Sequence, residues 1–183
     1  KQKAILSFPY SKKKYEAVIA DGAIRSGKTI PMAIGFVIWA MSNFNECDFI
    51  IGSKTVGAAQ RNIIKPLQRM NYFKKEFRIN YTVSKGYMTV RRGDKVNYFY
   101  IFGGNTERSQ DVVQGGTMCG ALLDEVALMP RSFVEQVIAR CSDERALLWF
   151  NCNPEHPTHW FKQEWIDKAK EKRALYLHFT MDD

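Results

Sequence analysis

The chain alternates short apolar runs with segments of helical periodicity, and this alternation predicts its fold. The apolar runs have the length of buried strands and lie at residues 18–21, 48–53, 118–123, 146–151 and 174–180. The segments between them repeat apolar residues three and four positions apart, at residues 29–43, 55–70, 131–141 and 160–172. Strands that alternate with helices form parallel sheets with right-handed crossovers, so we expect an α/β fold with helices flanking a mainly parallel sheet.

The middle of the chain has a different pattern. Two stretches rich in β-forming residues, 87–90 and 96–102, flank the turn RRGDK at residues 91–95. This arrangement predicts an antiparallel hairpin added to the parallel core. A solvated hairpin tip is the simpler explanation of the charges in the turn, and contact with DNA phosphate is the alternative.

The first apolar run leads directly into a glycine-rich loop with the Gly-x4-Gly-Lys-Thr spacing of a P-loop, and a helical segment follows it. The residues that we expect to bind nucleotide are Gly22, Ala23, Ile24, Arg25, Ser26, Gly27, Lys28 and Thr29. Backbone N–H groups of such a loop surround a phosphate at the positive end of the next helix. Lys28 would bridge the β- and γ-phosphates, and the hydroxyl of Thr29 would bind Mg²⁺. The loop therefore predicts ATP and Mg²⁺ as ligands.

A second motif lies far downstream, where the apolar run at residues 118–123 ends in Asp124 and Glu125. In open α/β sheets, ligands bind at the carboxyl ends of the strands. We expect Asp124 to hold Mg²⁺ through water and Glu125 to orient and deprotonate the attacking water. An acidic pair at a strand end is weak evidence alone, but downstream of a P-loop it indicates a P-loop NTPase of the RecA-like (ASCE) type.

The apolar run at residues 146–151 ends in the sequence Asn151-Cys152-Asn153-Pro154. An amide at the tip of this strand could hydrogen-bond the γ-phosphate or Glu125 and so sense hydrolysis. Asn-Pro is also good turn chemistry without any catalytic role. The residues alone leave both interpretations open.

Size and composition place further bounds on the protein. Its 183 residues suit one α/β domain, and 45% hydrophobic residues can bury a sizeable core. The sequence starts at Lys1 rather than at a methionine and ends just after an apolar strand, so we expect a single domain cut from a longer polypeptide. No apolar run approaches the roughly 20 residues of a membrane helix, and no signal peptide is visible, so we expect a cytosolic protein without membrane contact.

Charge and aromatic residues add two open questions. The formal net charge of +8 favours a polyanionic partner, although a solvated basic surface would explain it as well. Phe8, Tyr10 and Tyr15 precede the first strand, where an aromatic ring could stack on adenine or pack against the sheet. The four cysteines lack Cys-x-x-Cys spacing, and we interpret them as reduced, buried thiols.

Three landmarks in order, the P-loop, the strand ending in Asp124 and Glu125, and the strand followed by Asn153 and Pro154, resemble the N-terminal ATPase domain of the large terminase subunit of tailed bacteriophages. An arginine inside the P-loop and the later pair His159-Trp160 strengthen the likeness, which covers nearly the whole chain. The resemblance implies a motor that packages double-stranded DNA into a procapsid, as a ring on the portal, with a small terminase subunit as partner. It also implies a viral protein in the host cytoplasm, and a separate nuclease domain that this chain lacks.

The same resemblance implies roles for single residues. Asn153 matches the motif that couples hydrolysis to movement, and Arg25 matches the P-loop arginine that senses or stabilises the γ-phosphate. The expected catalytic residues are therefore Glu125, Arg25, Lys28 and Asn153. From the residues alone, Arg25 could equally turn outward, and a neighbouring subunit could supply an arginine instead. Arg108, just before the second motif, is the candidate for that arginine.

Two other functions remain open at this level. A superfamily 2 helicase core also carries Asp-Glu after its strand, but here Val126 and Ala127 follow in place of a Ser-Ala-Thr motif. A nucleotide-gated interaction module would bind ATP to order a loop for a partner, with little turnover.

Overall fold

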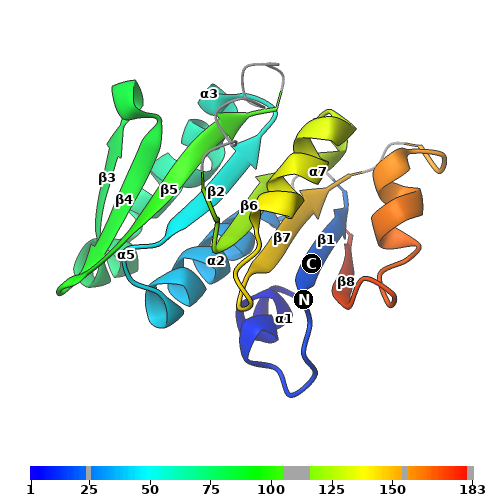
Figure 1. The fold of residues 1–183 in the computed structure, drawn as a ribbon, viewed down its shortest axis with the longest axis horizontal. Coiled ribbons are helices and arrows are strands. Elements are labelled where there is room, and N and C mark those ends of the chain that lie inside the picture. Colours follow the sequence, from blue (N-terminus) through cyan, green and yellow to red (C-terminus); the bar gives the residue numbers. More distant parts are fainter. Residues whose placement is uncertain (24–25, 105–115, 154–155, 181–183) are drawn as a thin grey trace.

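An eight-stranded sheet forms the centre of the molecule, with its strands in the order β3-β4-β5-β2-β6-β7-β1-β8 (Figure 1). The computed structural model describes residues 1–23, 26–104, 116–153 and 156–180. The strands are β1 (Ala17–Gly22), β2 (Asp48–Ser53), β3 (Arg78–Thr82), β4 (Tyr87–Arg92), β5 (Lys95–Gly103), β6 (Gly120–Asp124), β7 (Leu147–Cys152) and β8 (Ala174–Phe179). All neighbours from β5 to β8 pair in parallel, and only β3–β4 and β4–β5 are antiparallel. The prediction of a mainly parallel α/β sheet is confirmed.

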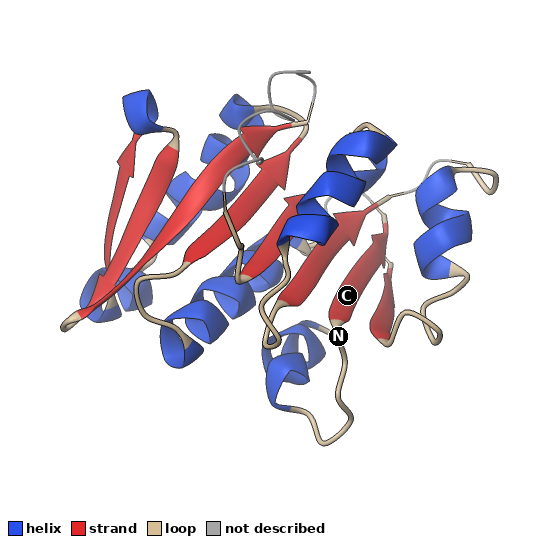
Figure 2. Cartoon of the chain, viewed as in Figure 1, coloured by secondary structure: helices blue, strands red, loops and turns tan. Residues whose placement is uncertain are grey.

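Helices cover both faces of this sheet (Figure 2). They are α1 (Gln2–Ser7), α2 (Thr29–Asn43), α3 (Val56–Ala59), α4 (Lys65–Arg69), α5 (Asn71–Glu76) and α7 (Arg131–Arg140). Short turns of other helical types complete them: η1 (Phe8–Tyr10), η2 (Gln60–Ile64), η3 (Val83–Lys85), η5 (Val126–Leu128) and η6 (Lys162–Ile166). Of these, η2 and η6 are π-helical. Helix α2 has the predicted bounds.

Two predicted helices differ from the structure. The segment predicted at residues 55–70 is helical, but it changes from α3 through η2 to α4, with Pro66 in the first turn of α4, where proline is tolerated. The helix predicted at residues 160–172 winds regularly only to Ile166 and then continues as turns. Both π-helical turns insert extra residues into the winding, which apolar periodicity cannot distinguish from a regular helix.

Strand β3 was not predicted, because its residues are polar or only half-buried and give no clear alternation. It pairs with β4 and extends the predicted hairpin to three antiparallel strands. Strand β5 belongs to both parts of the sheet, since its other edge pairs in parallel with β2. The hairpin is thus continuous with the parallel core.

Alternate residues of each central strand face two separate cores. In β1, Val18 and Ala20 pack on the side of α2, whereas Ala17 and Ile19 pack on the side of α7. Because both faces are covered, the strand is apolar at consecutive positions, as buried parallel strands are. This double burial explains why the sequence shows continuous apolar runs there.

A cluster of aromatic rings attaches α2 to the sheet. The ring centroids of Phe36 and Trp39 lie 5.0 and 4.8 Å from that of Trp149 in β7. Phe8 packs edge-on against the same tryptophan at 4.8 Å and is only 3% exposed. Phe8 is therefore part of the core and not a platform for adenine, whereas Tyr10 is 58% exposed.

The far end of α2 is fixed by a buried amide. Asn97 in β5 is fully buried and donates from Nδ2 to the carbonyl oxygens of Ala40 and Phe44, at 3.2 and 3.1 Å. Its Oδ1 accepts from the backbone N–H of Cys47 at 3.0 Å. The sheet thus supplies a donor to the carbonyl of Phe44 and a second donor to that of Ala40, which already accepts from the N–H of Phe44. The helix that begins at the P-loop is held at both ends.

Candidate functional site

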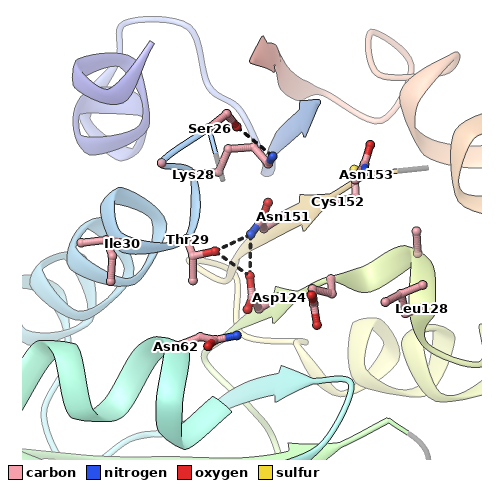
Figure 3. Close-up of a pocket in the computed structure, with 13 residues that line it drawn as sticks. Ser26, Lys28, Thr29, Ile30, Asn62, Asp124, Leu128, Asn151, Cys152 and Asn153 are labelled. Carbon is pink, nitrogen blue, oxygen red and sulfur yellow. Dashed lines mark hydrogen bonds between the residues drawn. The ribbon is translucent and has the colours of Figure 1, made fainter. Parts of the chain in front are cut away.

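A pocket with a volume of about 300 Å³ opens where β1, β6 and β7 end (Figure 3). Its lining joins the P-loop, the acidic pair and the asparagines at the carboxyl end of β7. The lining residues are Ser26, Gly27, Lys28, Thr29, Ile30, Asn62, Asp124, Glu125, Ala127, Leu128, Asn151, Cys152 and Asn153. The sheet therefore brings the predicted motifs together at the carboxyl ends of its parallel strands, as expected.

Both P-loop glycines have a backbone conformation that other residues avoid. Gly22 has φ +123° and Gly27 has φ +76°. The contact at Gly22 is also very close, since a Cβ there would lie 2.0 Å from the carbonyl oxygen of Phe179. Ser26 stabilises the turn by donating from Oγ to the carbonyl of Ala23 at 2.7 Å. Ile24 and Arg25 lie outside the described residues, and so does Arg108.

The ammonium group of Lys28 lies inside the loop. Its Nζ donates to the carbonyl oxygens of Gly22 and Ala23, at 2.9 and 2.6 Å, and to Oγ of Ser26 at 3.0 Å. The residue is only 6% exposed, and burial lowers the pKa of its ammonium, which the carboxylates of Asp21 and Asp124 oppose. The loop thus concentrates one positive charge at the predicted phosphate position.

Three side chains from three elements form a hydrogen-bonded triangle. Thr29 Oγ1 donates to Asp124 Oδ1 at 3.2 Å, and Asn151 Nδ2 donates to Thr29 Oγ1 at 2.9 Å and to Asp124 Oδ1. Figure 3 shows this triangle between Lys28 above it and Asn62 below it. The register of the sheet explains the meeting, because Asp124 and Asn151 are partners on neighbouring strands.

Asp124 is the buried carboxylate of the site, with 2% exposure. Burial raises its pKa, and the hydrogen bond from Asn151 opposes that shift, as do Thr29 and Lys28. A hydroxyl oxygen and a carboxylate oxygen at this separation are the hard ligands that Mg²⁺ prefers. The donor set of Thr29 and Asp124 therefore fits the predicted magnesium site.

Glu125 follows Asp124 in a left-handed conformation, with φ +60°. Such a conformation costs a non-glycine residue on the order of 1–3 kcal/mol, and it recurs at active sites. It turns the chain from β6 into η5, whose residue Leu128 donates its N–H to the carbonyl of Glu125 at 2.9 Å. Glu125 lines the pocket next to Asp124, and its role as the base stays a prediction.

The structure distinguishes between two asparagines, Asn151 near the end of β7 and Asn153 just after the strand. Asn153 lines the pocket, but Asn151 is the residue that contacts Thr29 and Asp124. Sequence reasoning assigned the functional amide to Asn153 and did not select Asn151. The position of Asn151 could have indicated its role, because it follows a run of apolar residues just as Asp124 does.

Asn62 is a second pocket residue that the sequence did not indicate. It lies on the π-helical turn η2, and Figure 3 shows it reaching toward Asp124 from the side opposite β7. Turns of this type often occur at functional sites because they redirect a side chain that a regular helix would place elsewhere. No motif marks this position in the sequence.

Comparisons with known proteins agree with this geometry. Residues 19–182 match the family model described as terminase large subunit, T4likevirus-type, N-terminal. A solved large terminase from a thermophilic bacteriophage is 49% identical, with a TM-score of 0.93 over 100% of this chain and 45% of its own. A second structure of that terminase, in complex with ADP, is also 49% identical, with a TM-score of 0.91 and the same coverage. No curated protein matched the sequence.

A more distant structure shares only the fold. The ATPase domain of the large terminase of Thermus phage P74-26 is 16% identical, with a TM-score of 0.70 over 97% of this chain and 78% of its own. This chain spans less than half the length of the terminase that is 49% identical to it. The family model covers nearly the whole sequence, and the 49% identity extends over all of it. The chain therefore belongs to the family of terminase large subunits of the T4-like type and corresponds to the N-terminal region that this family model describes.

Proposed function

We propose that this chain is the ATP-hydrolysing motor domain of a viral terminase large subunit, which moves double-stranded DNA into a procapsid. The observation that carries the proposal is the triangle of Thr29, Asp124 and Asn151 directly beneath the P-loop lysine. Family membership favours this function over a superfamily 2 helicase or a nucleotide-gated module. The complexes of the similar thermophilic-phage terminase with ADP and with ATP-γ-S support ATP as the nucleotide.

The phosphates would bind where Lys28 now contacts its own loop. Lys28 would exchange the carbonyls of Gly22 and Ala23 for oxygens of the β- and γ-phosphates. The fit of Thr29 and Asp124 supports Mg²⁺ as the cofactor, and when bound it would neutralise charge on the phosphates. Asn151 would keep both ligands in place by donating to each.

Glu125 is the proposed base, because its carboxylate lies at the pocket wall beside the buried Asp124. It would orient the attacking water and accept its proton as the water oxygen bonds to the γ-phosphorus, while the bond between the γ-phosphorus and the β–γ bridging oxygen breaks and ADP leaves. Arg25 and Arg108, outside the described residues, remain the candidates for stabilising the γ-phosphate from this chain and from a neighbouring subunit.

Replacing Glu125 by glutamine tests the base. The Glu125→Gln variant should bind a fluorescent ATP analogue with unchanged affinity and release phosphate about a hundredfold to ten-thousandfold more slowly than the wild type. Unchanged steady-state hydrolysis would overturn the assignment. Phosphate release should be measured with saturating ATP and Mg²⁺.

A cationic groove at the other end of the sheet supports DNA as the partner. It has a volume of about 650 Å³, and its wall joins α5, β3 and β4. The basic residues in its lining are Lys74, Lys75, Arg78, Arg91 and Arg92. These basic residues lie in two separate segments of the sequence, residues 74–78 and 91–92, and the fold brings the two segments together.

Two exposed arginines of this groove bring like charges close together. Arg78 and Arg91 are directly opposite on neighbouring strands, where like charges destabilise a sheet. Among the described residues, the ion pair of this groove joins Arg92 to Glu76 at 3.1 Å and leaves the charges of Arg78 and Arg91 uncompensated. A phosphodiester backbone would supply the missing negative charge.

Salt dependence tests this contact. The double variant Arg78→Gln/Arg91→Gln should weaken binding of duplex DNA and lower the slope of log K against log salt by about 2. A matched control, Lys12→Gln/Lys14→Gln, removes two exposed charges from the N-terminal segment and should leave that slope unchanged. Equal slopes for the two variants would contradict a DNA contact in the groove.

The remaining proposals concern context. We propose that residues 1–183 form one ATPase domain of a longer protein, and that nuclease activity belongs to a part outside this chain. The portal and a small terminase subunit would be its partners, in a ring during packaging, within the host cytoplasm. Within the described residues, no helix has the length and apolar character needed to cross a membrane.

A further inference from the structure

The last strand, β8, closes over the point where the chain enters the P-loop. It pairs with β1 so that Asp21 is opposite His178 and Gly22 is opposite Phe179. The backbone N–H of Ala23 continues this pairing and donates to the carbonyl oxygen of Phe179 at 3.2 Å. The loop entry is therefore attached to the edge of the sheet.

A buried carboxylate strengthens this attachment. Asp21 is 8% exposed, and its Oδ2 accepts from the hydroxyl of Tyr176 at 2.8 Å. Nδ1 of His178 lies 3.1 Å from the same oxygen and donates there when it carries a proton. Burial, and then the bond to Asp21, raise the pKa of the Tyr176 phenol, so this group remains a donor at neutral pH. Neither contact belongs to the nucleotide site described above.

The same short stretch faces the P-loop lysine from its other side. Lys28 donates to the carbonyls of Gly22 and Ala23, and Phe179 approaches the backbone of these two residues from β8. The backbone of Gly22 lies directly against that of Phe179, because a Cβ added at Gly22 would be only 2.0 Å from the carbonyl oxygen of Phe179. Because the N–H of Ala23 donates to the carbonyl oxygen of Phe179, a displacement of these peptide units by phosphate would strain or shift their contact with β8.

We propose that Tyr176 and His178, acting through Asp21, are positioning residues for the P-loop. We also propose that nucleotide binding slows the opening of β8 through the same contacts. The proposal rests on the proposed function, because it concerns the position of the phosphate-binding loop. The two donors hold Asp21, Asp21 fixes the end of β1, and the end of β1 sets where the carbonyls of Gly22 and Ala23 lie. Conversely, the backbone hydrogen bonds of β8 open less often when phosphate replaces those carbonyls around Lys28.

The test combines binding with hydrogen exchange. In the wild type, amide exchange of residues 174–179 should slow when ATP-γ-S and Mg²⁺ are added. The double variant Tyr176→Phe/His178→Ala should bind ATP-γ-S roughly threefold to tenfold more weakly, the range expected for loss of one or two such bonds, and should lose the exchange response. Tyr72→Phe, on an exposed tyrosine of α5, should behave as the wild type in both measurements.

Two results would overturn the proposal: wild-type affinity in the double variant, or exchange in wild-type β8 that does not respond to ATP-γ-S. The single variants Tyr176→Phe and His178→Ala are measured too, so that misfolding of the double variant, detected by circular dichroism, leaves the comparison intact. A wild type that binds ATP-γ-S but releases no phosphate from ATP would instead refute the proposed function and leave this inference standing.

Discussion

Truncating Asn151 should separate the residue that organises the site from the residue that the sequence indicated. Asn151→Ala removes an amide that donates to both Thr29 and Asp124. Asn153→Ala, two residues later, removes an amide that lines the same pocket outside this triangle. The two residues are matched in type, in their place near the end of β7 and in the pocket that they line. The difference in stability between the two variants therefore measures what the triangle contributes.

The magnitude follows from the two bonds. A hydrogen bond to a charged group contributes about 1.5–3 kcal/mol, and a neutral one about 0.5–1.5 kcal/mol. Asp124 is 2% exposed, so water cannot easily replace the lost donor. We expect Asn151→Ala to lower the free energy of unfolding by about 3 kcal/mol, which for a chain of this size lowers Tm by about 6–12 °C. Asn153→Ala should change that free energy by less than about 0.5 kcal/mol.

Urea denaturation and thermal scanning measure the free energy of unfolding and Tm. Titration with ADP in the presence and absence of Mg²⁺ measures the nucleotide affinity and the part of it that Mg²⁺ adds. The Asn151→Ala variant should lose most of the affinity that Mg²⁺ adds, because only the bond between Thr29 and Asp124 then holds the two oxygen ligands in place. If Asn151→Ala unfolds within about 2 °C of the wild type, or if Asn153→Ala shows the larger effect, the triangle is not the organising element of the site.

Three further variants test other parts of the structure. Asn97→Leu should lower the unfolding free energy by about 2–3 kcal/mol in urea, because it removes the donor to the carbonyl of Phe44 and the acceptor of the Cys47 N–H, and a smaller loss would contradict the capping role. Asn62→Ala should slow phosphate release by about tenfold to a hundredfold with unchanged ADP affinity, whereas the exposed Asn71→Ala should not; equal rates would remove Asn62 from the site. The hydrogen bond from Arg145 lowers the pKa of Asp143, so this ion pair stabilises the fold above pH 3.8 and the stabilisation is lost as pH falls through the lowered pKa. The urea midpoint of Asp143→Asn should therefore be below that of the wild type at pH 7 and converge with it toward pH 3; a constant difference would refute the linkage.

Local pattern was sufficient for the elements that carry the chemistry. The P-loop, helix α2 and the strand before Asp124 were predicted because each combines a short motif with a periodicity that neighbouring residues alone define. The parallel sheet followed from the alternation of such elements. Each of these segments would keep its preference for helix, strand or turn if it were isolated, and the fold only assembles the segments.

Long-range pairing decided the rest. Asn151 rather than Asn153 meets Asp124 because the register of β6 on β7 makes them partners. Asn62 enters the pocket through a π-helical turn, and Arg78 faces Arg91 through a strand that has no apolar alternation. A sequence carries the period of each element, but the alignment between elements depends on contacts between distant residues. The sequence therefore determined that a phosphate-binding loop exists, and only the tertiary structure decided which side chains hold it in place.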